Sequence, residues 1–277
     1  MIEQSLAFFA NWFSNPNFTA MGIAIVMGII WYAAYRPPVR GGYGFLWLVM
    51  AASAILTLLA IVTIQMPLQA LVGQLLTRAF APDILVTWLY ILGIPQVALS
   101  GLVQEGSKMI PMLFIWQRSE RNLDAKVGLL IGAAAGLGFG VFEALWTLNQ
   151  AYAAGWTLST AQAGGFLGLA PVWERFFVIA GHTAFSALAG YGLATERGWI
   201  FYLIAAALHT LVNYTVVLLQ SGLIGASTVE ILVALVAAGA TAWVLYIRYT
   251  GEPTPWGRTY RRRLHLGKEP SEYITKQ

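Results

Sequence analysis

The feature that most constrains this chain is a series of long apolar segments separated by short polar turns. A helix needs about 20 apolar residues to cross a bilayer, and a membrane-spanning backbone must satisfy its own polar groups. Seven segments meet this requirement: 19–35, 43–65, 82–118, 127–149, 171–195, 199–220 and 229–247. The pattern predicts an all-α protein, a polytopic transmembrane helical bundle of seven helices, or eight if 82–118 divides at its glycines and proline.

The composition agrees with a membrane protein and excludes several other classes. Hydrophobic residues make up 58% of the 277 positions and charged residues only 10%, whereas a soluble domain has roughly 25% charged residues. The absence of cysteine excludes disulfides, thiolate catalysis and cysteine-ligated zinc. The net charge of +4 is not a nucleic-acid signature. We therefore expect the lipid bilayer and a membrane protein or peptide as partners, and no nucleic acid.

Three regions are expected along the chain. Residues 1–18 are mildly amphipathic and are predicted to lie on the membrane surface. Residues 19–248 form the transmembrane bundle. Residues 249–277 form a basic tail, predicted to be cytoplasmic.

The positions of the basic residues predict the orientation of the bundle, because lysine and arginine are enriched in cytoplasmic loops. The loops 150–170 and 221–228 contain neither residue and are predicted to lie outside. Apart from Arg78 in the connector after the second span, the basic residues outside the spans gather in four places: Arg36 with Arg40, Arg118 to Lys126, Arg197, and the tail. The predicted topology has seven crossings, with the N-terminus outside and the C-terminus cytoplasmic.

One apolar segment contains a charged stretch, Gln104-Glu105-Gly106-Ser107-Lys108. A charged side chain at membrane depth is costly unless it is paired or solvated, and it therefore marks a candidate functional site. Glu105 and Lys108 are three residues apart, so on a helix they share one face.

Other spans place polar residues at a similar depth. Counted from the cytoplasmic ends of their helices, the ionisable groups lie about 18–25 Å deep at 1.5 Å per residue. Spacing of four residues puts His182 with Ser186, and His209 with Asn213, on shared faces. A single site is predicted to gather Glu105, Glu143, His182, His209 and Asn213 around one cavity. A more ordinary interpretation is that each histidine forms one interhelical hydrogen bond, and that Glu174 and Arg175 form an interfacial ion pair.

Glycines recur every four residues in one span, at Gly128, Gly132, Gly136 and Gly140. Small residues at this spacing let helix backbones approach closely. The stripe predicts tight helix packing immediately before Glu143.

The residue types favour hydrolysis. A glutamate can act as general base on water, and histidine and asparagine can donate hydrogen bonds to a developing oxyanion. Alternatively, Glu143, His182 and His209 form a zinc site with an open position for water. The residues leave open whether the cofactor is absent or is one divalent metal. Buried Glu, His and Lys also suit a proton-coupled transporter or a scaffold that binds transmembrane segments, but the matching broken helices of a transporter repeat are not found.

Four motifs in this order give the region 97–215 a resemblance to a superfamily of intramembrane proteases that includes PrsW, the type II CAAX prenyl proteases and YhfC. The first resembles Glu-Glu-x-x-Lys/Arg, the second Phe-x-x-x-Glu, the third a pair of charges before His-x-x-x-Ser, and the last His-x-x-x-Asn/Asp. They are found at 104–108, at 139–143, at Glu174-Arg175 with 182–186, and at 209–213.

The resemblance implies an intramembrane endopeptidase that cleaves a membrane-embedded or membrane-proximal peptide bond. Carried over by position, the catalytic candidates are Gln104, Glu105, Glu143, His182, His209 and Asn213. The supporting candidates are Lys108, Ser186, Glu174 and Arg175. Under this resemblance Glu105 and Glu143 are acid or base candidates, and Asn213 is an oxyanion donor.

Gln104 departs from the family pattern, which has a carboxylate at this position. Either Glu105 suffices, or the chain is a non-catalytic homologue, or a glutamate has been replaced by its isostere. Because glutamine cannot accept a proton from water, we predict normal folding and substrate binding with weak or no cleavage. On this hypothesis Gln104→Glu restores or raises cleavage.

Overall fold

The computed structural model describes residues 16–37 and 44–250, and within them all regular structure is helical. The predicted interfacial segment 1–18 and the basic tail 249–277 lie almost entirely outside the described residues. The long helices are α2 (Phe18–Ala34), α3 (Phe45–Ala60), α7 (Ile94–Arg118), α8 (Ala125–Ala153), α11 (Ala170–Ala194), α12 (Gly198–Gln220) and α13 (Ala226–Thr250). The shorter ones are α4 (Met66–Ala79), α5 (Pro82–Thr87), α6 (Leu89–Leu92), α9 (Leu158–Ala163) and α10 (Gly165–Gly168).

Five helices in the described part of the chain are long and apolar enough to cross a membrane: Phe45–Ala79, Ala125–Ala153, Ala170–Ala194, Gly198–Gln220 and Ala226–Thr250. The helix α2 is apolar but shorter. The helix α7 has 25 residues, a spanning length, and carries the charged stretch. The prediction of an all-α membrane bundle is confirmed.

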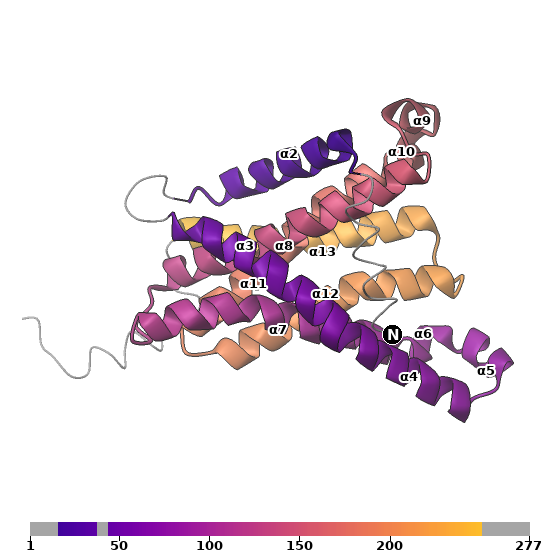
Figure 1. The fold of residues 1–277 in the computed structure, drawn as a ribbon, viewed down its shortest axis with the longest axis horizontal. Helices are drawn as coiled ribbons and strands as arrows, with labels where there is room; N and C mark the ends of the chain where they lie inside the picture. Colours follow the sequence, from indigo (N-terminus) through magenta and orange to yellow (C-terminus); the bar gives the residue numbers. More distant parts are fainter. Residues whose placement is uncertain (1–15, 38–43, 251–277) are drawn as a thin grey trace, which may run out of the picture.

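The second span differs from the sequence expectation, which ended it at Gln65 and placed a separate connector after it. Instead, α3 continues through a π-helical turn, Ile61–Gln65, into α4. A proline in a helix lacks an N–H and crowds the preceding turn, and the wider π turn ends two residues before Pro67. The resulting 35-residue helix is ~52 Å long at 1.5 Å per residue. It extends past the bundle, and α5 and α6 lie near its far end (Figure 1).

The segment 82–118 divides where its glycine and proline predict. Two short helices, α5 and α6, precede Gly93, and α7 begins at Ile94 with a proline in its first turn. Proline is tolerated there because the first N–H groups of a helix have no intrahelical partner. The charged residues therefore lie in one continuous helix.

The glycine stripe of α8 packs against α11, as predicted. A Cβ at Gly132 would be 2.1 Å from the Ser186 carbonyl oxygen, and one at Gly136 would be 2.0 Å from that of His182. Only glycine permits this approach. At Gly140 the hypothetical Cβ would be 3.2 Å from the Cβ of His182. The close crossing thus brings His182 beside the turn of α8 that carries Glu143.

Candidate functional site

Glu105 and Lys108 form a fully buried ion pair on one face of α7. Lys108 Nζ is 2.6 Å from Glu105 Oε1, and both side chains are 0% exposed. The ammonium also donates to His182 Nδ1 at 2.8 Å and lies 5.1 Å from the centroid of the Phe139 ring. A buried pair is tolerated only when further partners satisfy both charges, and these contacts supply them.

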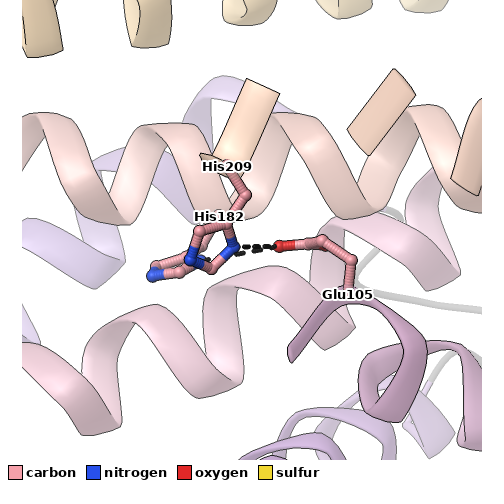
Figure 2. A group of neighbouring side chains, drawn as sticks. All are labelled: Glu105, His182 and His209. Atoms are coloured by element: carbon pink, nitrogen blue, oxygen red, sulfur yellow. Dashed lines mark hydrogen bonds and ion pairs between the residues drawn. The ribbon is translucent and has the colours of Figure 1, made fainter. Parts of the chain in front are cut away.

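The carboxylate of Glu105 is held on both oxygens by three helices. Oε1 also accepts a hydrogen bond from His209 Nδ1 at 2.8 Å, and Oε2 accepts one from Ser186 Oγ at 3.0 Å. Figure 2 shows the two histidine rings directed at this carboxylate from neighbouring helices. A buried carboxylate with both oxygens engaged orients its partners rather than binding water.

These contacts fix which nitrogen of each histidine carries a proton. Because a lysine ammonium can only donate, His182 Nδ1 accepts from Lys108 and the ring proton is on Nε2. His182 Nε2 then donates to Glu143 Oε2 at 3.1 Å. His209 Nδ1 is protonated and donates a hydrogen bond to Glu105, so His209 Nε2 remains an acceptor. The two rings meet edge to face with centroids 4.9 Å apart.

Glu143 is in a more open environment than Glu105. Its side chain is 19% exposed, and Oε2 also accepts from Arg175 NH1 at 3.3 Å. The same guanidinium donates to Glu174 at 2.5 Å. The pair Glu174–Arg175 is therefore more than an interfacial ion pair, because Arg175 connects it to the site.

A cavity of about 60 Å³ opens beside Glu143, between α8, α11, α12 and α13. His182, His209 and Asn213 also line it. Because a water molecule takes roughly 30 Å³ in the liquid, the cavity can admit water. Four of the five residues predicted to share one cavity thus do so, whereas Glu105 is in contact with both histidines but is not among the residues that line it.

Gln104 belongs to a different set of contacts from Glu105. Its Nε2 donates to Gln65 Oε1 and to Ser100 Oγ, each at 3.1 Å. Ser100 Oγ also accepts from Asn213 Nδ2 at 2.9 Å. Sequence reasoning missed both Gln65 and Ser100. Ser100 could have been found, because it precedes Gln104 by four residues on one helix face, but Gln65 stood at the expected end of a span.

The atoms best placed to hold a metal belong to Glu105, His182 and His209, whose ligand atoms lie within 4.8 Å of one another. The structure thus gathers Glu105, in place of Glu143, with the two histidines. Carboxylate and imidazole suit zinc by type. However, Lys108 Nζ is 2.6 Å from Glu105 Oε1 and 2.8 Å from His182 Nδ1, so an ammonium already holds this centre. A dication beside it would be strongly repelled at low dielectric. As arranged, these residues do not fit a divalent ion.

A family model described as PrsW family intramembrane metalloprotease matches residues 45–243. No curated protein and no solved structure matches the chain significantly. The matched range begins at the first residue of α3 and contains all the site residues described above.

Proposed function

Because this chain belongs to the PrsW family of intramembrane metalloproteases, we propose that it hydrolyses a peptide bond of a membrane-embedded or membrane-proximal polypeptide, using a water molecule activated by Glu143. The observation that supports this proposal most is the position of Glu143. It lines a cavity together with His182, His209 and Asn213. Glu174 lines the same cavity, but it is Glu143 that contacts His182 Nε2, at 3.1 Å.

The reaction begins with a water molecule in this cavity. Glu143 takes one proton from the water. The free lone pair of His209 Nε2 accepts a hydrogen bond from the other O–H of the same water molecule. The water oxygen then forms a bond to the carbonyl carbon of the substrate.

The charge that develops on the carbonyl oxygen needs a donor. The Asn213 amide uses one N–H for Ser100 Oγ and has a second N–H for this oxyanion. When the carbon–nitrogen bond breaks, Glu143 returns its proton to the leaving amine. Glu105, Lys108 and Ser186 position the two histidines and do not touch the substrate.

The family description names a metal, but the residues present do not fit a divalent ion and the proposed reaction has no metal-dependent step. The only cluster of candidate ligands found among the described residues is the one that already holds the Lys108 ammonium. The proposed chemistry therefore depends on the glutamate alone.

The topology predicted from the basic residues is also part of this proposal. It has the N-terminus outside, the C-terminus cytoplasmic and the transmembrane bundle at 19–248. The helix α12 supports it, because this helix of spanning length connects Arg197, predicted to lie inside, with the loop 221–228, predicted to lie outside. Since the chain has no cysteine, single cysteines at Gly155 and at Asn122 can be labelled with a membrane-impermeant maleimide in whole cells. Only the cysteine at position 155 is expected to react. Labelling of the cysteine at position 122 alone would indicate the opposite orientation.

The catalytic proposal is tested with the purified chain in lipid vesicles. The probe is a synthetic transmembrane peptide of about 20 leucine and alanine residues, with a central Gly-Gly pair. Glu143→Gln keeps the shape and the acceptor oxygen but cannot take a proton, so cleavage should fall by roughly 10²–10⁴-fold. The matched control is Glu174→Gln, which also loses a carboxylate beside Arg175.

Equal cleavage by the wild-type chain and Glu143→Gln would contradict the proposal. If Glu143→Gln does not fold, Asn213→Ala supplies the test, with an expected loss of roughly 10²–10³-fold in kcat. A wild-type chain that binds the peptide without cleaving it would instead support the non-catalytic alternative.

A further inference from the structure

A second and larger cavity adjoins the site on the other side of α12. It measures about 510 Å³ and lies between α4, α5, α6, α7 and α12. Asn213 lines both this cavity and the smaller one beside Glu143. The two cavities therefore meet at the residue proposed to bind the oxyanion.

The lining of this larger cavity is polar but uncharged. Among the described residues, those that line it include no charged side chain. Its polar members are Gln69, Gln96, Ser100, Asn213 and Gln220, and the others are glycine, leucine and valine. We call this cavity the amide cleft because four of its five polar side chains are carboxamides.

The helices α4 and α5 beside the amide cleft expose several large apolar side chains, together with the polar residues Gln74, Arg78 and Asp83. On α4, Leu71 and Leu75 are exposed, as are Val86 and Trp88 on and after α5. These exposed apolar side chains can face lipid, while the carboxamides line the cleft. The cleft thus offers hydrogen-bonding groups where lipid supplies none.

Hydrogen bonds connect the cleft to Gln104. Gln69 Nε2 donates to the Gln96 carbonyl oxygen at 2.8 Å, and Gln65 Nε2 lies 3.4 Å from Gln69 Oε1. Gln104 donates in turn to Gln65 and Ser100. Gln104 Oε1 is buried without a hydrogen-bond partner among the described residues. Gln104 is not itself among the residues that line the cleft, so it supports the cleft through Ser100 and Gln65.

We propose that the amide cleft binds an unwound, uncharged stretch of the substrate polypeptide and leads it to Asn213. This inference rests on the function proposed above. A peptide bond inside a helix is shielded by the helix, so the substrate must unwind before water can attack. Unwinding in an apolar environment exposes backbone N–H and C=O groups that must find partners.

A carboxamide suits this ligand better than any charged group. It carries a donor and an acceptor on one uncharged side chain, which matches the peptide unit. A different cavity of about 590 Å³, between α7 and α12, has Arg121 and Glu196 in its lining. It is not expected to take the uncharged substrate and serves as the control region.

The first experiment separates substrate binding from chemistry. Gln69→Leu and Gln96→Leu are compared with Gln74→Leu, an exposed residue on the same helix as Gln69, in the cleavage of the leucine–alanine peptide. Each cleft variant should raise KM roughly tenfold, the effect of one lost hydrogen bond, with kcat within about twofold of wild type. Unchanged KM in both cleft variants, or a loss confined to kcat, would overturn the inference.

The second experiment locates the peptide directly. The chain lacks cysteine, so single cysteines replace Leu89 in the amide cleft or Leu113 in the control cavity, both in the Glu143→Gln background. The peptide carries one cysteine beside its Gly-Gly pair. A disulfide with Leu89→Cys and none with Leu113→Cys supports the inference, whereas a disulfide only with Leu113→Cys, or none at all, overturns it.

The two proposals fail differently in these experiments. If cleavage depends on Glu143 but no disulfide forms at Leu89→Cys, the proposal that the amide cleft binds the substrate is refuted and the proposed chemistry stands. Cleavage that does not depend on Glu143 removes the chemistry, wherever the peptide forms its disulfide.

Discussion

The two glutamates of the site are connected through His182 but are in different environments. Glu105 reaches His182 through the Lys108 ammonium, is 0% exposed, and has both oxygens engaged. Glu143 binds the opposite ring nitrogen of His182 and is 19% exposed at the edge of a cavity. The same residue type therefore has two roles: Glu105 supports the histidines, whereas Glu143 is accessible from the cavity. This difference indicates that accessibility, more than the motif in which a glutamate occurs, assigns its role.

The comparison also explains how one histidine ring is held. Lys108 on one side requires His182 Nδ1 to accept, and Glu143 on the other side receives the Nε2 proton. The closed half of the site thus sets the direction of the hydrogen bond that reaches the open half.

The sharpest test exchanges the two glutamates for glutamine in parallel. Glu143→Gln should lower cleavage by roughly 10²–10⁴-fold with thermal unfolding close to wild type. Glu105→Gln leaves a buried ammonium without its counter-ion, so it should lose about 3–5 kcal/mol of stability. Circular dichroism melting and peptide cleavage measured on both variants check this. The reverse result, an inactive but stable Glu105→Gln, would assign the base to α7.

The second prediction concerns metal. Lys108→Met removes the ammonium from between Glu105 and His182 while keeping most of its volume. The three ligand atoms already lie within 4.8 Å, so the variant should acquire one zinc ion per chain. The wild-type chain should contain none, and its cleavage should survive chelation with less than about twofold loss, since the proposed reaction has no metal-dependent step. Elemental analysis of both proteins measures this, and stoichiometric zinc in active wild type would show that Lys108 moves aside for the ion.

A smaller effect is expected at Arg175, which holds Glu143 Oε2 from the open side. Arg175→Gln removes one of two donors to this oxygen and leaves the His182 contact. Cleavage should fall about tenfold, the effect of one lost charge-assisted hydrogen bond. Because Arg175 also pairs with Glu174, the double variant Glu174→Gln with Arg175→Gln is the control for an unpaired carboxylate. An unchanged rate in Arg175→Gln would show that His182 alone orients the base.

Much of this arrangement could be predicted from the sequence because it depends on local spacing. The three-residue step from Glu105 to Lys108, the four-residue step from His182 to Ser186 and the glycine stripe of α8 each follow from helix geometry. The apolar segments likewise predict the helices of the bundle.

What the sequence could not provide is the set of neighbours around each side chain. Glu105 and Glu143 look alike in sequence, and only tertiary packing closes one and opens the other. Gln65 was missed because the second span was predicted to end at that residue, whereas the π turn lets the helix continue into α4. The amide cleft depends on that continuation, since Gln69 is in the extension.

The smallest predicted effect is at Gln104, where the sequence and the structure disagree most. The motif predicts that Gln104→Glu raises cleavage, because a carboxylate there would supply the missing base. In the structure the Gln104 amide donates to Gln65 and Ser100, and a glutamate has no N–H for either. We therefore expect Gln104→Glu to lower cleavage by less than about threefold, because Ser100 would be less firmly positioned to accept the hydrogen bond from Asn213.

Two further variants decide how a change at Gln104 is to be understood. Gln104→Leu removes the hydrogen bonds to Gln65 and to Ser100, which lines the cleft, so it should raise KM as the amide-cleft variants do. Gln104→Glu combined with Glu143→Gln asks whether a carboxylate on α7 can replace the one on α8. Recovery of cleavage in this double variant would place the working base on α7. The carboxylate at position 104 would then reach the water from the α7 side, which is closed in the wild-type chain. Continued inactivity would confine the chemistry to the cavity beside Glu143, because a carboxylate at position 104 would then be present and still unable to act.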